Sequence, residues 1–239
     1  LLPFKDKNGV KQVFSDLNLN AKAIGKSQGY AFEQRDPKVL LSLAVIENVL
    51  VFTGRVNKTT NNLSARSKDV VTLSTMVSSN LEIMTALNGM SEKDLAQDED
   101  WRSLRKRKPN DPEIVTAASP LIEFWNIYTS KTPGWDKLGK EGGVTAGQLR
   151  DGIAENQSGY VSAFGVGFQA AANAYAALIR DRREEEAKKL IALCLTNVDW
   201  QKGEHWAGHA MIGTRVNNTG PGIKASAGYI LHKGGVKPN

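Results

Sequence analysis

The stretch "DPKVLLSLAVIENVLVF", residues 36–52, decides the fold class. Asp36 is a favoured helix N-cap, and Pro37 suits the first helical position because its missing N–H would have no partner there. The residues that follow are almost continuously apolar, which favours a helix buried in a core. The sequence therefore predicts a protein built from packed helices.

Helical signals recur on both sides of this stretch. A second cap, Asp111 followed by Pro112, precedes an apolar stripe in which Pro120 predicts a kink. Thr145 and Gln148 match a capping box. Strand patterns are scarce, so we expect a mainly α protein with about eight to ten helices. Besides residues 36–52, the expected helical segments are 9–21, 73–87, 112–128, 146–156, 182–195 and 223–233.

Composition limits the class of protein. The chain has 239 residues, of which 41% are apolar and 23% charged, as in ordinary soluble globular proteins. Its net charge of +6 favours anionic partners, nucleic acid first. Cys194 is the single cysteine, so a disulfide framework is excluded and a reducing cytoplasm fits best. Its place in the apolar run "LIALCL" favours a small buried side chain over a nucleophile.

A long uncharged run, "QSGYVSAFGVGFQAAANAYAALI" at residues 157–179, raises the question of membrane insertion. Gln157, Gln169 and Asn173 interrupt it, and Ala, Gly and Ser outnumber Leu and Ile. Small residues let neighbouring helices approach closely. We therefore expect this run to be the core helix of the second half of the chain and expect no membrane partner.

The glycine-framed stretch "NAKAIGKSQG", residues 20–29, ends like a phosphate-binding loop. However, Asn20 stands where that loop needs its first glycine, and a helical segment precedes it in place of a strand. A basic surface loop is the default interpretation. Lys22 and Lys26 could still approach a phosphate as side-chain cations.

The second candidate is "GRVNKTTNNLSARSKD", residues 54–69, which we call the polar loop. Phosphate oxygens need cations for charge and short donors for positioning, and this loop holds both, with no acid before Asp69. Arg66 and Lys68 are expected near the N-terminus of the next helix, whose dipole favours an anion. A solvated polar loop with an N-cap is the alternative. The cations of the polar loop are Arg55, Lys58, Arg66 and Lys68.

Two further stretches carry candidate functional residues. The basic run "WRSLRKRK", residues 101–108, fits nucleic-acid contact or a flexible loop paired with the acidic residues just before it. In "EHWAGHAMIGTRVNN", residues 204–218, His205 and His209 are four apart and could face one metal from a helix. A third ligand is not evident, so structural histidines are favoured and we predict no metal or other cofactor. No nucleophile elbow or recognisable carboxylate pair marks a catalytic residue.

Several blocks together resemble the DndB family of DNA sulfur modification (phosphorothioation) proteins and its DGQHR-motif, ParB-like relatives. Each block is weak alone, but they follow the family order from about residue 10 to 232. They are "QVFSDLNLNAKAIGKSQGYAFEQRDP", "RVNKTTNNLSARSKDVVTLSTM", "YVSAFGVGFQAAA" and "HWAGHAMIGTRVNNTGPGIKASAGYI".

The chain departs from the family pattern at a few positions. The DGQHR signature is absent and the first residue is Leu, so we expect the sequence to start partway into the ParB-like domain. Ser162 and Phe164 stand where the family has histidines, and His209 stands where it has arginine. Functions carried by those family side chains are not transferred to this chain.

The resemblance implies residues 1–35 as the C-terminal remnant of an α/β ParB-like domain, followed by a multi-helix domain over residues 36–239. A Gly-, Pro- and Lys-rich stretch predicts a subdomain joint near residues 130–144. The resemblance also implies a bacterial, DNA-binding transcriptional regulator of the modification genes, not a sulfur-transfer enzyme. The alternatives are a ParB-like nucleotide hydrolase or nuclease, and an accessory subunit of the modification complex that does not touch DNA.

These expectations assign DNA contact to seven cations. The four cations of the polar loop come first, and the weaker candidates are Lys22, Lys26 and Arg215. Other DNA sulfur modification proteins are expected partners, and homo-oligomerisation stays open.

Overall fold

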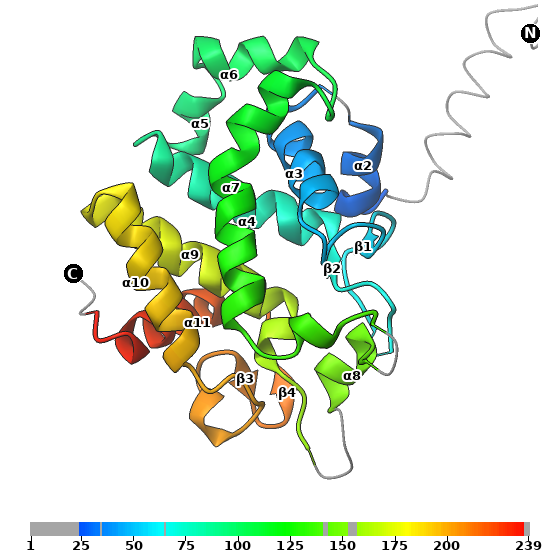
Figure 1. Ribbon diagram of the computed structural model, residues 1–239, viewed down its shortest axis with the longest axis vertical. Helices are drawn as coiled ribbons and strands as arrows, with labels where there is room; N and C mark the ends of the chain where they lie inside the picture. The colour runs from blue at the N-terminus through cyan, green and yellow to red at the C-terminus, as the bar shows by residue number, and fades with distance from the viewer. Residues whose placement is uncertain (1–23, 34, 65, 141–142, 153–156, 237–239) are drawn as a thin grey trace, which may run out of the picture.

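The computed structural model describes residues 24–33, 35–64, 66–140, 143–152 and 157–236. Within these ranges the protein is mainly α-helical, as the sequence predicts (Figure 1). The expected helix at residues 9–21 lies outside them. The α-helices are α2 (Lys26–Phe32), α3 (Pro37–Asn48), α4 (Leu73–Leu87), α5 (Glu92–Leu95), α6 (Glu99–Ser103), α7 (Pro112–Lys131), α8 (Ala146–Asp151), α9 (Gly165–Asp181), α10 (Glu184–Asn197) and α11 (Gly220–Lys233).

Short elements connect these helices. Single 3-10 turns are η1 (Leu104–Lys106), η2 (Trp135–Lys137), η3 (Val161–Ala163) and η4 (Glu204–Trp206). The strands are β1 (Val56–Asn57), β2 (Val71–Thr72), β3 (Met211–Ile212) and β4 (Arg215–Val216). β1 pairs with β2 in parallel, and β3 pairs with β4 in an antiparallel hairpin.

Capping side chains begin the helices where the sequence predicts. Asp36 accepts a hydrogen bond from the Lys38 backbone N–H at 3.1 Å at the start of α3. Asp111 does the same for α7, and the capping box of Thr145 and Gln148 opens α8. These bonds satisfy backbone donors that the first helical turn leaves without a partner.

Helix α7 continues through Pro120. Proline has no N–H to donate to the carbonyl four residues earlier, which belongs to Thr116. The Ser119 hydroxyl donates to that carbonyl oxygen at 2.7 Å instead. The side chain thus replaces the backbone bond that proline removes.

The charge-free run at residues 157–179 is only partly helical. Helix α9 begins at Gly165 and is buried over most of its length. Before it, Tyr160 forms a β-bridge with Gln201, and the 3-10 turn η3 follows. The prediction of a core helix is right for α9 and wrong for residues 157–164, which contain the bridge at Tyr160 and the 3-10 turn η3 in place of an α-helix. Among the described residues, none of the helices combines the length and apolar character needed to span a bilayer.

The core forms where α4, α7 and α9 meet. α9 packs most closely against α4 and α11, and α7 packs against α3 (Figure 1). The Trp125 indole N–H donates to Asn80 Oδ1 at 2.7 Å, and the Asn80 amide donates to the Ser42 hydroxyl at 3.0 Å. All three side chains are buried. This chain of hydrogen bonds fixes the relative positions of α3, α4 and α7.

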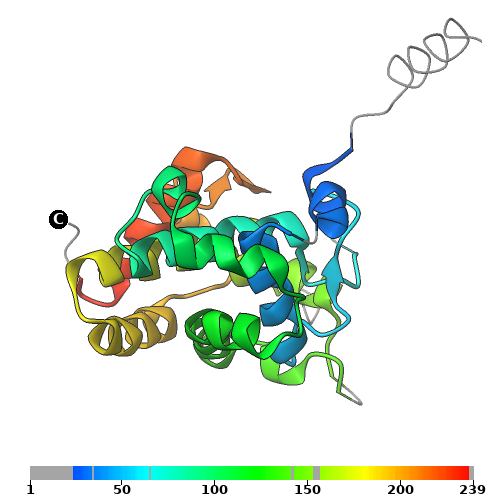
Figure 2. The same ribbon diagram turned by 90° about the horizontal axis from the view of Figure 1, so that it is seen from above.

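Residues on both sides of the proposed domain limits pack together. Helix α2, the described part of residues 1–35, packs against α4. The hydrophobic cluster includes Trp125 before the predicted joint, Trp135 within it and Phe168 after it. Seen from above, α2 and α10 lie at opposite ends of the molecule (Figure 2). The ParB-like remnant and the subdomain joint therefore stay predictions.

Candidate nucleic-acid interface and its pocket

The polar loop leaves and returns to the body of the protein at one place. Its ends are joined by the parallel pairing of β1 with β2, and the Val70 N–H donates to the Arg55 carbonyl at 2.8 Å. The loop therefore projects from a closed base, beside α2 and α8 (Figure 1).

Arg150, on α8, holds the far end of the polar loop. Its Nη1 donates to the Asp69 carbonyl at 3.0 Å, and its Nη2 donates to the Ser67 carbonyl. The side chain is almost completely buried, and burial lowers the pKa of its guanidinium. Sequence reasoning missed this residue, because a single arginine in a short helix carries no signal of burial.

Internal hydrogen bonds also order the polar loop. Asn57 donates to the Asp69 carboxylate at 2.7 Å, and its Oδ1 accepts from the N–H groups of Thr59 and Thr60. Asn61 Oδ1 accepts from the Ser27 backbone N–H at 3.0 Å. The loop is thus shaped before it meets a partner, which reduces the ordering cost of binding.

The Gly-Lys-Ser triplet at residues 25–27 takes part in this hydrogen-bond network through Ser27. Ser27 is fully buried at the start of α2, and its hydroxyl lies 2.9 Å from that of Ser74 in the first turn of α4. Lys26 is exposed beside it. The serine therefore ties α2 to α4 and to the polar loop, while the lysine stays at the surface.

The cations of the polar loop differ in their surroundings. Lys58, Arg66 and Lys68 are exposed, and none forms an ion pair with another described residue. Arg55 is half-buried, and its Nη1 donates to the carbonyls of Leu50 and Val51 at 3.3 and 3.4 Å. The first three are placed for an anionic partner, whereas the Arg55 guanidinium also supports the chain after α3.

The predicted link with a helix N-terminus is not realised for Arg66 and Lys68. α4 begins only at Leu73, after β2, with Thr72 as its N-cap. The two cations precede that strand, so neither belongs to the first turn of the helix.

The remaining predicted cations lie elsewhere. Arg215 is exposed on β4, next to Val216, and Lys22 lies outside the described residues. Val216 lines the same pocket as residues 61–63 of the polar loop. The structure therefore brings Val216 of the β3–β4 hairpin and the polar loop to one pocket.

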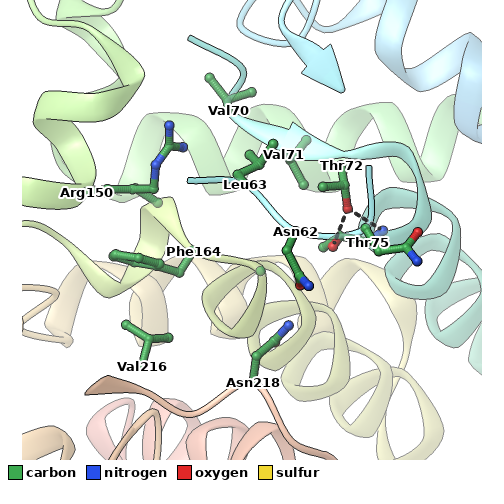
Figure 3. A pocket seen from close by; sticks show the side chains of 13 residues that line it. Asn62, Leu63, Val70, Val71, Thr72, Thr75, Arg150, Phe164, Val216 and Asn218 are labelled. Atoms are coloured by element: carbon green, nitrogen blue, oxygen red, sulfur yellow. Dashed lines mark hydrogen bonds between the residues drawn. The ribbon is translucent and has the colours of Figure 1, made fainter. Parts of the chain in front are cut away.

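This pocket has a volume of about 170 Å³ and lies between the polar loop and the starts of α4 and α9 (Figure 3). Its polar side chains are Asn61, Asn62, Thr72, Thr75, Arg150 and Asn218. Its apolar side chains are Leu63, Val70, Val71, Ala163, Phe164 and Val216. No carboxylate is among the described residues that line it.

The amide groups in the pocket keep hydrogen-bonding capacity. The Asn62 side chain forms no hydrogen bond with another described residue, and Figure 3 shows it extending from the loop toward the side where Asn218 lies. Asn218 Oδ1 accepts from Gln169 Nε2 at 3.4 Å, which leaves its own N–H groups for another acceptor. By contrast, Thr72 and Thr75 bond each other at 2.9 Å.

The basic run at residues 101–108 and the histidine pair are the other two candidates from the sequence. In the basic run, Arg107 pairs with Glu113 at 2.7 Å and with Asp111 at 3.8 Å. These acids follow the run, so Arg107 pairs with them and not with the acidic residues before the run. The other cations of the run, Arg102, Arg105, Lys106 and Lys108, are exposed.

The histidine pair does not share a helix. His205 lies in η4, where its Nε2 is 3.1 Å from the Asp199 carbonyl. His209 follows that turn, and its ring stacks on Tyr229 with centroids 5.2 Å apart. Across the described ranges, no group of three or more His, Cys, Asp or Glu side chains could hold a metal ion.

Comparison with known proteins places the chain in a family. No curated protein and no solved structure gives a significant match. A family model described as "DndB: DNA-sulfur modification-associated" matches residues 2–237, which is nearly the whole chain. The protein therefore belongs to the DndB family of DNA-sulfur modification-associated proteins.

Proposed function

We propose that this protein is a DNA-binding transcriptional regulator of bacterial DNA phosphorothioate modification, and that the polar loop contacts DNA phosphates. The family links the chain to DNA sulfur modification, and the net charge of +6 favours a nucleic-acid partner. Acting on DNA places its work in the bacterial cytoplasm. Other proteins of the modification system are proposed partners.

One observation supports this assignment most directly. The polar loop is fixed by Arg150, Asn57 and Ser27, yet Lys58, Arg66 and Lys68 remain exposed and without an ion pair among the described residues. Phosphate contacts usually combine such cations with short polar side chains and backbone N–H groups. Lys22, Lys26, Arg55 and Arg215 are proposed as weaker contacts.

A salt titration of DNA affinity tests the contact. The slope of log K against log salt concentration is negative. Its magnitude should decrease by about 0.9 for each contact with a phosphate of double-stranded DNA that is removed. A Lys58→Ala, Arg66→Ala, Lys68→Ala variant should therefore bind DNA more weakly and with a flatter slope than the wild type.

The matched control removes three exposed cations elsewhere, by Lys93→Ala, Lys131→Ala and Lys189→Ala. It changes the net charge equally and should keep more of the wild-type slope. Equal slopes for the two triple variants would show that overall charge, and not the polar loop, governs binding.

Regulation needs a second measurement in cells. Transcript levels of the modification genes should change on deletion of the gene for this protein, and the polar-loop variant should fail to restore them. If transcripts are unaffected while the protein co-purifies with the modification enzymes after nuclease treatment, the accessory-subunit function replaces the proposed one. Hydrolysis of a nucleotide or cleavage of DNA by the purified full chain would favour the ParB-like enzyme instead.

A further inference from the structure

We infer that the pocket between the polar loop, α4 and α9 binds a single unpaired nucleobase of DNA. This inference rests on the proposed function, because the base belongs to the DNA that the exposed cations are proposed to hold. Cations alone would not recognise a base. The structural basis is the chemistry of the pocket lining, its size and the charges beside it.

The lining suits a neutral polar ring better than a phosphate. Arg150 is the only ionisable side chain among the described lining residues, and both of its terminal nitrogens donate to polar-loop carbonyls. The groups that remain for a ligand are the amide of Asn62 and the side-chain N–H groups of Asn61 and Asn218, whose oxygens already accept hydrogen bonds. An amide offers a donor and an acceptor side by side, which matches the edge of a nucleobase.

Phe164 supplies an aromatic wall. Its ring lines the pocket, and Lys202 Nζ lies 5.5 Å from the ring centroid. Proteins that hold unpaired bases commonly stack them on aromatic side chains and place cations close by for the backbone. The apolar side chains of Leu63, Val71 and Val216 complete a surface that can cover the faces of a ring.

The size of the pocket limits its occupant. Its volume of about 170 Å³ is below the ~300 Å³ at which pockets for drug-sized ligands begin. It therefore suits one ring system and not a whole nucleotide. A base stacked inside a duplex cannot reach such a pocket, so the base must be unpaired or turned out of the helix.

The charges beside the pocket indicate that the base is carried by DNA. Arg66 and Lys68 lie in the polar loop between lining residues Leu63 and Val70, and Arg215 precedes Val216. These side chains are exposed. They could hold the phosphates on either side of the base while the base itself occupies the pocket.

The test compares three DNA duplexes of one sequence: fully paired, with one bulged base, and with an abasic site in the bulge. The bulged base should tighten binding roughly tenfold over the other two, as expected for one stacked base. A 2-aminopurine placed in the bulge should change its fluorescence on binding. Mononucleotides are a separate arm, and they should compete only weakly.

Variants connect the effect to the pocket. Phe164→Leu keeps an apolar side chain but should reduce the preference for the bulged base from roughly tenfold to roughly twofold. Asn62→Ala should also reduce it, and because Asn62 is exposed this variant remains informative if Phe164→Leu does not fold. Asn126→Ala, at an exposed position on α7, is the matched control and should keep the full preference.

The outcomes separate the two proposals. Equal binding of all three duplexes would overturn the base pocket and leave the DNA-binding function intact. Binding of none of them would overturn both. A mononucleotide that competes as strongly as the bulged duplex would overturn DNA as the source of the base.

Discussion

Arg150 Nη1 donates a hydrogen bond to the carbonyl oxygen of Asp69 at 3.0 Å, between residues that are 81 positions apart in the sequence. The bond joins α8 to the end of the polar loop, and the same guanidinium also donates to the Ser67 carbonyl. One buried cation thus shapes a surface on which other cations are exposed. Arg150 supplies structural support here, whereas Lys58, Arg66 and Lys68 remain exposed as candidate DNA contacts.

Replacing Arg150 should destabilise the protein. Arg150→Ala removes two hydrogen bonds from a charged donor and leaves a buried space, so we expect a loss of about 3 kcal/mol in the free energy of unfolding. Arg150→Lys should restore little of it, because an ammonium group does not reproduce the fork of a guanidinium. Urea denaturation measures both, with the exposed Arg102→Ala as control. Equal stability of Arg150→Ala and the control would contradict this role.

The buried chain from Trp125 through Asn80 to Ser42 gives a second prediction. Asn80→Ala leaves the indole N–H of Trp125 without its acceptor and should cost about 2 kcal/mol of stability. Ser78→Ala, at an exposed position of the same helix, should change the stability by less than about 0.5 kcal/mol. Thermal or urea unfolding distinguishes them, and similar losses for the two variants would show that the buried bond contributes little.

Pro120 offers a stabilising change. Pro120→Ala provides an N–H for the Thr116 carbonyl, which now accepts the Ser119 hydroxyl. We expect the free energy of unfolding to increase by about 1 kcal/mol, since proline inside a helix is strongly unfavourable. Ser119→Ala should destabilise the wild type more than it destabilises Pro120→Ala. A fall in stability for Pro120→Ala would mean that the ring contributes more through packing than it costs in the helix.

The Cys194 thiol should be unreactive in the folded protein. It is fully buried, and burial raises its pKa to about 11. Because the thiolate is the reactive form, labelling with a thiol reagent at pH 8 should be slow in buffer and fast in denaturant. Rapid labelling of the folded chain would contradict the burial.

The same shift has a consequence for stability at high pH. The folded state holds the proton more tightly than the unfolded state does, so the contribution of Cys194 is complete below the unfolded thiol pKa of about 8.5 and is lost as pH rises toward 11. Cys194→Ala should lose less stability than the wild type between these pH values. Unfolding experiments at several pH values measure this difference, and parallel losses would contradict it.

Local sequence determined most of the helices. The caps at Asp36, Asp111 and Thr145 need only neighbouring residues, because a capping side chain bonds backbone N–H groups two or three positions away. The helical stripe at residues 73–87 likewise matches α4 from end to end. Apolar content alone was misleading at residues 157–164, where backbone groups bond to Leu149, Trp200 and Lys202 instead of forming an α-helix.

The candidate site depended on tertiary structure. The exposed cations of the polar loop were visible in the sequence, because charge and polarity are properties of the residues themselves. Arg150, Phe164 and Asn218 were not identified as parts of one pocket, since they come from separate elements and meet only when α8, α9 and the start of α11 pack beside the loop. Composition determined that the protein is basic and helical, whereas long-range packing and buried hydrogen bonds decided which polar groups support the loop and which remain for a ligand.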